Sequence, residues 1–215
     1  MSNTTDDEQL AQIKDWWQRN GKPLLTGGAL ALAIVFGWQA WQNHQANQAF
    51  GASTVYQQLL EVALVPASEV DAGALAELTN KLKSDYAGSA YAQYGALLLA
   101  KVAVEQNRFD EAATELKAVL DKPFDNVLGE LARQRLARVL AAQDKAEEGL
   151  ALLNEGKVVN QFAASREEVK GDLLVSLGRI DEARDAYSKA KAAMGDEAAQ
   201  GTVEMKLNDL AKGDA

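Results

Sequence analysis

The residues that could carry catalytic chemistry are few in this chain of 215 residues. It contains no cysteine and one histidine, His44, so zinc sites built from Cys and His are excluded. A Ser-His-Asp arrangement would need His44, which follows an uncharged apolar run and is better interpreted as an interfacial surface residue. The paired carboxylates Glu167 and Glu168 suit a solvated helix start. Catalysis by carboxylates alone stays open, but we expect no catalytic residues, no metal and no cofactor.

Candidate residues for binding a partner are easier to find. A few cations are expected on the concave face of an array of helix hairpins, which the sequence repeat described below predicts. The expected partner-binding residues on this concave face are Tyr94, Leu98, Lys101, Arg135, Arg138 and Asp172. The basic members could hold an acidic or carboxylate-bearing segment of a partner. Alternatively, Arg138 and Asp172 pair with each other and only fix neighbouring helices. A net charge of −9 disfavours nucleic acid as a partner.

A sequence repeat is expected to position these residues. Three turns align at spacings of 37 and 34 residues, and each has a turn former, a base, an apolar or small residue, two acids and a small residue. The turns are 107–112, 144–149 and 178–183. The two acids favour a helix that begins directly after each turn, where the helix dipole is positive. A period of this length is typical of stacked helix hairpins.

Two further columns of the repeat predict how the hairpins pack. Small residues stand seven positions before each turn, at Ala100, Ala137 and Gly171, and large apolar residues stand nine positions after it, at Leu116, Leu153 and Tyr187. The small residue would let the second helix approach, and the large residue would fill the groove beside it. This register resembles a degenerate tetratricopeptide repeat. An irregular helical bundle with accidental spacing is the alternative.

The predicted fold is all-α. Ser68 is expected to cap one helix, and a C-terminal helix with Val203, Leu207 and Leu210 is expected to cap the apolar end of the stack. The expected helix pairs are 47–65 with 68–84, 89–106 with 109–121, 127–142 with 145–155, and 161–177 with 180–194, followed by the last helix at 196–212.

One segment near the N-terminus is predicted to cross a lipid bilayer. Residues 24–41 carry no charge and, as a helix, would span about 27 Å, close to the hydrocarbon core of roughly 30 Å. Trp38 and Trp41 would lie at the membrane interface. We therefore expect a single transmembrane helix at 23–42. A buried core helix and a cleavable signal peptide are the alternatives.

Flanking charges predict the orientation of this helix. Lys14, Arg19 and Lys22 precede it, and no Lys or Arg follows until Lys81. Because cytoplasmic flanks collect Lys and Arg, residues 1–22 are expected in the cytoplasm and residues 43–215 are expected to be exported.

Small residues recur every four positions along the membrane helix, at Ala29, Ala33 and Gly37. Such a stripe would let another transmembrane helix approach closely. The alternative is that the stripe faces lipid, since small residues are common in membrane helices.

This layout resembles the YfgM family of ancillary subunits of the bacterial SecYEG translocon. The resemblance is carried by residues 100–105, 135–140, 171–178 and 205–211. It implies an inner-membrane protein whose tetratricopeptide-like domain faces the periplasm. It also implies association with the SecYEG translocon, with the membrane-anchored periplasmic chaperone PpiD and with exported polypeptides. The family offers no catalytic residues to carry over.

The leading functional hypothesis is a non-enzymatic adaptor tethered beside a translocon. A second hypothesis is a membrane-anchored regulator that sequesters a stress-signalling response regulator, through residues 1–22. A third is a cleaved periplasmic protein with an enzymatic role.

Overall fold

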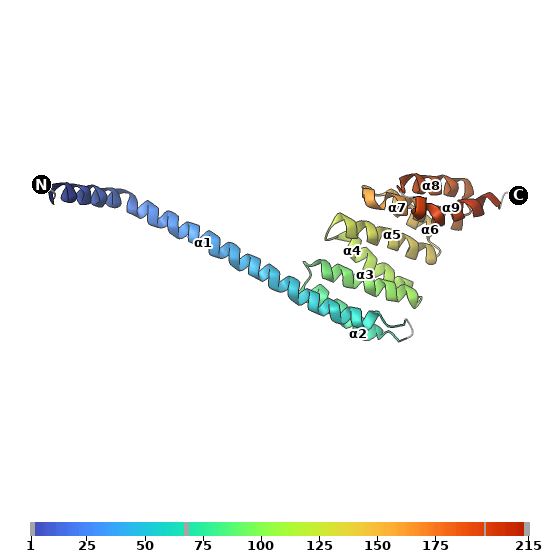
Figure 1. Cartoon of the computed structure of the whole chain (residues 1–215). Helices are drawn as coiled ribbons and strands as arrows, with labels where there is room; N and C mark the ends of the chain where they lie inside the picture. The colour runs from blue at the N-terminus through green and yellow to red at the C-terminus, as the bar shows by residue number, and fades with distance from the viewer. Residues whose placement is uncertain (1–2, 67–68, 196, 213–215) are drawn as a thin grey trace. The chain divides into compact units, whose positions relative to one another are not determined.

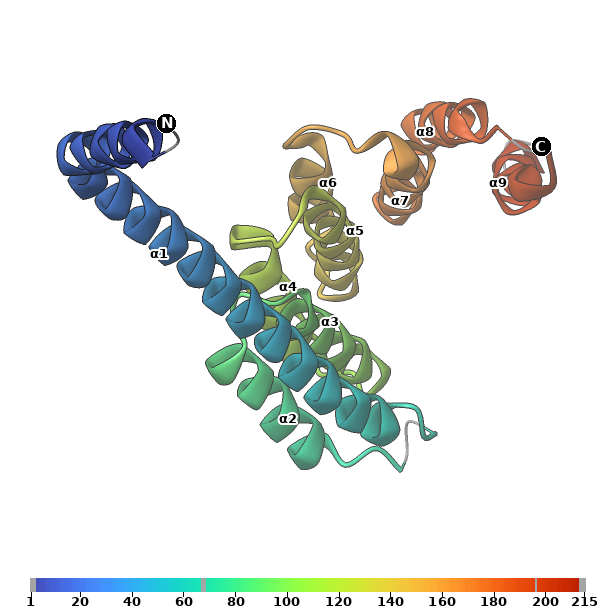
Figure 2. The ribbon, with the colours of Figure 1, turned by 60° about the vertical axis from the view of Figure 1, so that its left-hand side comes forward.

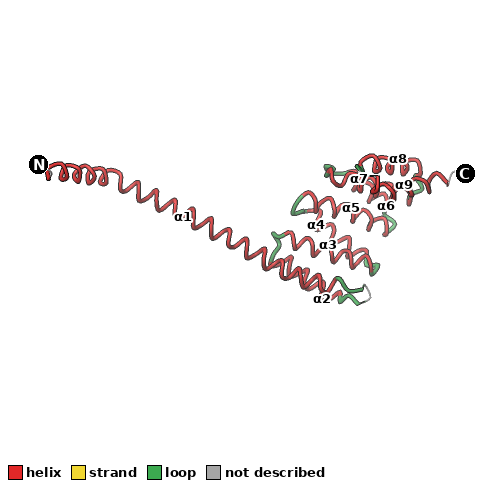
Figure 3. The backbone as a smooth tube through the Cα atoms, in the orientation of Figure 1, coloured by secondary structure: helices red, strands yellow, loops and turns green. Residues whose placement is uncertain are grey.

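The computed structural model describes residues 3–66, 69–195 and 197–212, and within these ranges every regular element is a helix (Figure 1). Short loops and turns join the helices (Figure 3). The expected all-α fold is confirmed. The chain divides between Phe50 and Gly51 into two compact units.

Helix α1 runs from Asn3–Ala63 and contains the predicted membrane segment. A stretch within Ile13–Ala63 is long and apolar enough to cross a membrane, and none of it is buried inside the protein. The rings of Trp38 and Trp41 lie side by side on this helix, with centroids 5.1 Å apart. The prediction of one apolar N-terminal helix is thereby confirmed. Helix α1 extends beyond both ends of the predicted transmembrane stretch 23–42.

Pro23 lies inside α1 and disturbs it locally. Proline has no N–H to donate to the carbonyl of Arg19, and its ring collides with the preceding turn, so a helix bends there. The darkest blue, N-terminal part of α1 is turned away from the rest of the helix in Figure 2. The Thr26 hydroxyl donates to the carbonyls of Lys22 at 2.9 Å and Pro23 at 3.0 Å, so this polar group is satisfied within the helix.

The second unit begins with the end of α1 and continues as a series of helix hairpins. Each helix from α3 to α8 contacts the next in the chain, and the first helices of successive hairpins also touch, α3 with α5 and α5 with α7. The helices are α2 Ala72–Asp85, α3 Ala90–Glu105, α4 Phe109–Asp121, α5 Asn126–Ala142, α6 Ala146–Asn154, the short 3-10 helix η1 Asn160–Phe162, α7 Ala163–Ser176, α8 Ile180–Ala193 and α9 Glu197–Lys212.

These bounds agree with the predicted pairs to within a few residues, with two differences. The expected helix 47–65 is the end of α1 and not a separate element. The next helix begins at Ala72, later than expected, and Asp71 caps it by accepting a hydrogen bond from the Ala74 N–H at 3.0 Å. Ser68, the expected cap, lies outside the described residues.

The three aligned turns share one backbone conformation. Asn107, Asp144 and Gly178 occupy the same turn position and have φ of 59°, 60° and 71°. In each turn the next residue donates its N–H to a carbonyl five positions back, as Arg108 does to Ala103 at 2.7 Å. This pattern is a Schellman cap, which closes a helix through one residue with positive φ. The repeat seen in the sequence is therefore also a repeat in backbone geometry.

The small and large columns pack as predicted. All six side chains or backbones of these columns are buried, and Gly171 gives the clearest case. A Cβ at Gly171 would lie 2.3 Å from the ring of Tyr187, so the ring rests directly on the α7 backbone. At Gly149 a Cβ would lie 2.7 Å from the Ala137 carbonyl oxygen, so α6 and α5 approach equally closely.

Helix α9 covers the apolar end of the stack, as expected. Val203 is fully buried, and Leu207 and Leu210 pack against the cluster formed by α5 to α8. The Lys206 ammonium lies 2.8 Å from a Glu168 carboxylate oxygen and 2.5 Å from an Asp172 carboxylate oxygen, both on α7. The C-terminal capping helix is thus fixed by polar contacts as well as by apolar packing.

Candidate partner-binding site

The first helices of the hairpins carry all the residues expected to bind a partner. Helix α3 carries Tyr94, Leu98 and Lys101, helix α5 carries Arg135 and Arg138, and helix α7 carries Asp172. Because these helices touch in series, their outer faces form neighbouring parts of one surface. The structure brings three of the six residues together at one pocket and places the other three elsewhere.

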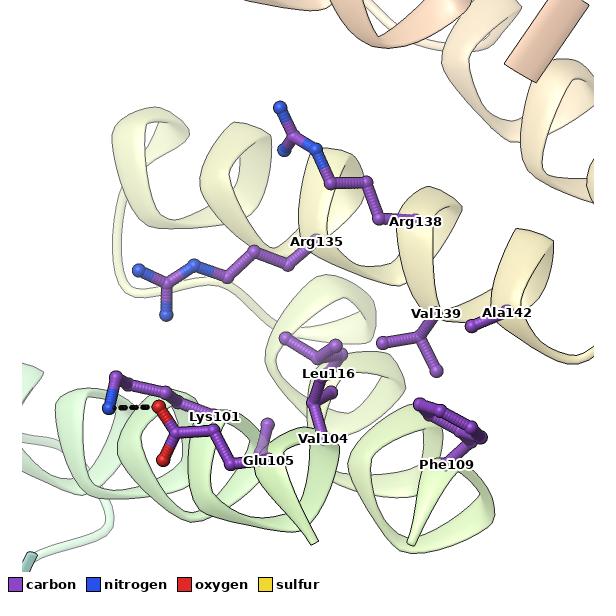
Figure 4. Close-up of a pocket in the computed structure, with 10 residues that line it drawn as sticks. Lys101, Val104, Glu105, Phe109, Leu116, Arg135, Arg138, Val139 and Ala142 are labelled. Atoms are coloured by element: carbon purple, nitrogen blue, oxygen red, sulfur yellow. Dashed lines mark ion pairs between the residues drawn. The ribbon is translucent and has the colours of Figure 1, made fainter. Parts of the chain in front are cut away.

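Lys101, Arg135 and Arg138 line one pocket between α3 and α5. Its volume is roughly 360 Å³, at the lower end of the range of about 300–1,000 Å³ for ligand pockets. In Figure 4, Lys101 and Arg135 extend on the same side of the pocket, and the Arg138 side chain extends away from the apolar residues.

Most of the remaining pocket wall is apolar and was not predicted. Val104 from α3, Phe109 and Leu116 from α4, and Val139 from α5 face one another in Figure 4. Val104 follows Lys101 by three positions, and Val139 follows Arg135 by four, so each valine shares a helix face with its cation. That spacing is a signal in the sequence from which this part of the pocket could have been found.

The cations of the pocket differ in how far their charges are balanced. Lys101 Nζ lies 2.6 Å from Glu105 Oε1 on the same helix. Arg135 donates from Nη1 to the Leu97 carbonyl at 3.4 Å, a long contact with a neutral group. Burial and then the positive charge of Arg138 lower the pKa of the Arg135 guanidinium. Among the described residues, neither arginine forms an ion pair, so the pocket has positive charge without a matching acid.

Tyr94 and Leu98 do not line this pocket. Tyr94 lies with Tyr56 and Tyr91 in an aromatic cluster, with ring centroids 5.4 to 6.0 Å apart. Leu98 packs against the apolar cluster formed by the end of α1, α2 and α3. Burial raises the pKa of the Tyr56 phenol, and the phenols of Tyr94 and Tyr91 add to that rise. This cluster ties α1 to α3, and Tyr94 stays the most exposed of its members.

Asp172 is engaged inside the fold and away from the pocket. It pairs with Lys206 of α9 and accepts a hydrogen bond from the Tyr187 hydroxyl at 2.8 Å. The alternative pairing of Arg138 with Asp172 is therefore not formed in the described structure. The sequence could not indicate the partner of Asp172, because the rotation of α9 about its own axis is set by packing alone.

Sequence comparisons identify the protein family. A family model described as a tetratricopeptide repeat-like domain matches residues 14–212. Proteins named "Ancillary SecYEG translocon subunit" are similar over almost their whole length. The protein of Haemophilus influenzae is 30% identical over 95% of this chain and 97% of its own, and that of Neisseria gonorrhoeae is 32% identical over 95% and 97%. The protein of Escherichia coli is 29% identical over 95% and 96%.

The chain belongs to the YfgM family. The matched range begins ahead of the apolar stretch of α1 and ends within α9, so the family likeness includes the predicted membrane segment, the array and the capping helix. In this YfgM-family chain the stripe residues Ala29, Ala33 and Gly37 are exposed on α1. Another helix packing against them stays a prediction.

A buried ion pair in this YfgM-family chain was missed by the sequence analysis. Arg166 of α7 and Glu130 of α5 are 1% and 3% exposed, and Arg166 Nε lies 3.6 Å from Glu130 Oε1. Arg166 also donates to the Glu155 carbonyl, and Gln134 donates to Glu130 at 2.9 Å. Glu130 also pairs with Arg133, whose Nε lies 3.8 Å from Glu130 Oε2, whereas removal of Glu130 would leave the Arg166 charge buried without an acid. The Arg166–Glu130 pair therefore fixes α7 on α5. Charged residues give no signal of burial in a sequence, because they are normally exposed.

Proposed function

We propose that this chain is a membrane-anchored, non-enzymatic accessory subunit of the SecYEG translocon. The observation that carries this proposal is the similarity over 95% of the chain to proteins named as ancillary subunits of that translocon. The structure supplies what such a subunit needs, an apolar helix able to lie in a bilayer and a helical array with a pocketed surface. Helical arrays of this kind commonly bind other proteins.

The proposed topology places residues 1–22 in the cytoplasm, the helix 23–42 in the inner membrane and residues 43–215 in the periplasm. Support comes from Lys14, Arg19 and Lys22 on one side of the apolar segment and from the absence of Lys and Arg between it and Lys81 on the other.

The proposed partners outside the membrane are exported polypeptides and the membrane-anchored chaperone PpiD. Both the array and PpiD would be confined to the same membrane surface beside the channel. Confinement raises the effective concentration of one partner for another, so even weak contacts between them would be occupied. The adaptor would thereby pass newly exported chains from the translocon to chaperones.

The proposed contact with the channel uses the small-residue stripe of the membrane helix. Ala29, Ala33 and Gly37 lie on one face of α1, and a Cβ added at Gly37 would have nothing within 4 Å. Val35 lies about 200° around the helix from Ala33, on the opposite face. The two faces therefore offer a matched comparison.

Photo-crosslinking in intact membranes tests this proposal. A photo-reactive amino acid at position 33 is expected to give adducts with translocon subunits, and the same group at position 35 is expected to give few or none. Native chain solubilised in mild detergent should also co-purify with SecYEG. If no translocon subunit is captured from either position or co-purified, the proposed function is wrong.

Protease added to spheroplasts tests the topology. The array is expected to be degraded, and residues 1–22 to stay protected. Deletion of residues 1–15 is expected to leave co-purification with SecYEG intact. Lost regulation of a stress response with intact co-purification would favour the regulator hypothesis instead.

A further inference from the structure

The pocket between α3 and α5 combines an apolar wall with positive charge that no acid of the described chain neutralises. We propose that this pocket binds an internal segment of a partner polypeptide that inserts one large apolar side chain and places an Asp or Glu carboxylate beside Arg135. The inference deepens the proposed adaptor function, on which it rests, by stating the chemistry of the segment that the array recognises.

The apolar half of the pocket explains the inserted side chain. Val104 is 37% exposed, and it faces Leu116, Phe109 and Val139 across the pocket (Figure 4). An apolar side chain that enters here would remove its own surface and that of the pocket wall from water. Burial of a Leu or Phe side chain against this wall stabilises a complex through the hydrophobic effect, and the cost of ordering the segment offsets part of that gain.

The charged half of the pocket explains the carboxylate. Arg135 is half-buried, and its only hydrogen bond to the described protein is the long contact to the Leu97 carbonyl. A planar guanidinium in this state can accept a carboxylate through two parallel N–H···O bonds. Such a carboxylate would also reduce the repulsion between Arg135 and Arg138, whose charges disfavour each other in the empty pocket.

The arrangement of the helices favours an internal segment over a chain end. α3, α5 and α7 touch in series, so a partner chain can continue over neighbouring first helices on either side of the pocket. The net charge of −9 disfavours a nucleic acid as the occupant, because the protein as a whole would repel its phosphates.

A binding experiment with the full chain in nanodiscs of zwitterionic lipid tests the proposal. The probe is a fluorescein-labelled, C-terminally amidated heptapeptide of Gly and Ser with an adjacent Phe–Glu pair at its centre, and the readout is fluorescence polarisation. We expect saturable binding, and we expect a Phe–Gln peptide to bind about tenfold more weakly, as the loss of a charge-assisted hydrogen bond implies.

Substitutions in the protein separate the two halves of the pocket. Arg135→Gln and Val104→Gln are each expected to weaken binding of the Phe–Glu peptide by about tenfold. Arg138→Gln changes an exposed side chain that the fold does not need and is expected to weaken binding by less. Lys117→Gln on α4 removes the same charge from an exposed position outside the pocket and should change nothing.

Several results would overturn this inference. Equal binding of the Phe–Glu and Phe–Gln peptides would show that the carboxylate is not recognised. Unchanged binding of the Phe–Glu peptide to both arginine variants would show that the peptide does not bind in this pocket. Much tighter binding of a peptide with a free C-terminal carboxylate would show that the occupant is a chain end. If SecYEG co-purifies but no peptide binds, only the pocket inference fails. If the peptide binds but SecYEG is absent, only the proposed translocon function fails.

Discussion

The residues with positive φ at the aligned turns differ in how well they suit that conformation. Gly178 has no Cβ and adopts it without strain, whereas Asn107 and Asp144 are among the few other residues that tolerate it. At Gly178 an added Cβ would have nothing within 4 Å, so a substitution there creates no steric clash with neighbouring residues. The effect of a substitution there therefore reports the backbone conformation alone.

Gly178→Ala is expected to destabilise the array by about 1–2 kcal/mol, because alanine is strained at positive φ. Asn107→Gly and Asp144→Gly are expected to be neutral or slightly stabilising for the converse reason. Thermal unfolding followed by circular dichroism in detergent would measure all three. An unchanged melting temperature for Gly178→Ala would contradict the repeated Schellman geometry.

Gly171→Ala is expected to destabilise the array by about 1–3 kcal/mol, because the new Cβ would overlap the Tyr187 ring and push α8 from α7. The control is Gly201→Ala in α9, where a Cβ has nothing within 4 Å and the higher helix propensity of alanine should stabilise slightly. The same unfolding measurement applies. Equal effects of both substitutions would show that α7 and α8 are further apart than described.

At the scale of the elements, α9 is attached by a titratable contact. Burial lowers the pKa of Lys206, but hydrogen bonds to Asp172 and Glu168 outweigh burial and raise it overall. The ammonium also lies 5.5 Å from the centre of the Tyr187 ring, whose phenol has its pKa raised by burial and then by Asp172. Both groups therefore hold their protons more tightly in the folded protein than in the unfolded one.

Such a shift makes the attachment of α9 sensitive to alkaline pH. A raised folded-state pKa contributes stability that is fully present below the unfolded pKa, 10.5 for Lys206, and is lost as pH rises through the folded pKa. We expect Lys206→Gln to lower the melting temperature at pH 8 and to have less effect at pH 11, above the unfolded pKa. Scans of wild type and variant over this range are the measurement.

The control for this titration is Lys189→Gln, which removes an exposed ammonium from α8. It is expected to leave the melting temperature nearly unchanged at both pH values. A Lys206→Gln effect of the same size at pH 8 and pH 11 would show that the ammonium does not hold α9.

The sequence predicts nearly all the hairpin helices because turn residues mark their ends. Asn107, Asp144 and Gly178 lie at positive φ, and acids follow them at the next helix start. Where no such marker exists the prediction is poorer, because the helix that begins at Ala72 was expected from residue 68. Whether one helix continues through the polar residues 42–45 was left open, and the structure has it continuous. Residues 42–47 are polar or small and exposed, and helix propensity alone does not show whether a helix continues through them.

The candidate site was predicted only in part. Register placed Lys101, Arg135 and Arg138 on first helices, and the structure unites them at one pocket. The repeat register did not show the whole apolar wall, because Phe109 and Leu116 reach the pocket from α4, the second helix of the hairpin. Nor did it show that Asp172 is already bound by α9, which belongs to no repeat.

At the scale of the whole molecule, α1 contains the predicted membrane segment and also contributes its last turns to the array. Its last turns contribute Ala52, Val55, Leu59 and Ala63 to the apolar cluster with α2 and α3, all of them 5% exposed or less. The array therefore has no complete first hairpin without the end of α1. This sets the smallest piece of chain that should fold as the array does here.

Two truncated chains test this boundary. Residues 43–215 are expected to fold cooperatively, whereas residues 66–215 should leave Leu75 and Leu82 uncovered and unfold α2. Hydrogen–deuterium exchange is the measurement, with the amides of 72–85 protected in the longer chain and unprotected in the shorter. Similar protection of α2 in both chains would show that the end of α1 is dispensable.

Helix α1 is unbroken from the apolar stretch to Ala63, and this affects how easily a protease could release the array. Proteolytic nicking concentrates at exposed loop tips and poorly ordered ends, and an intact helix withholds its peptide bonds from a protease. Residues 43–50, which follow the apolar stretch, are helical and contain no loop. A protease acting between residue 43 and Ala63 would therefore first need several turns of α1 to unwind, so release of the array by cleavage there should be slow.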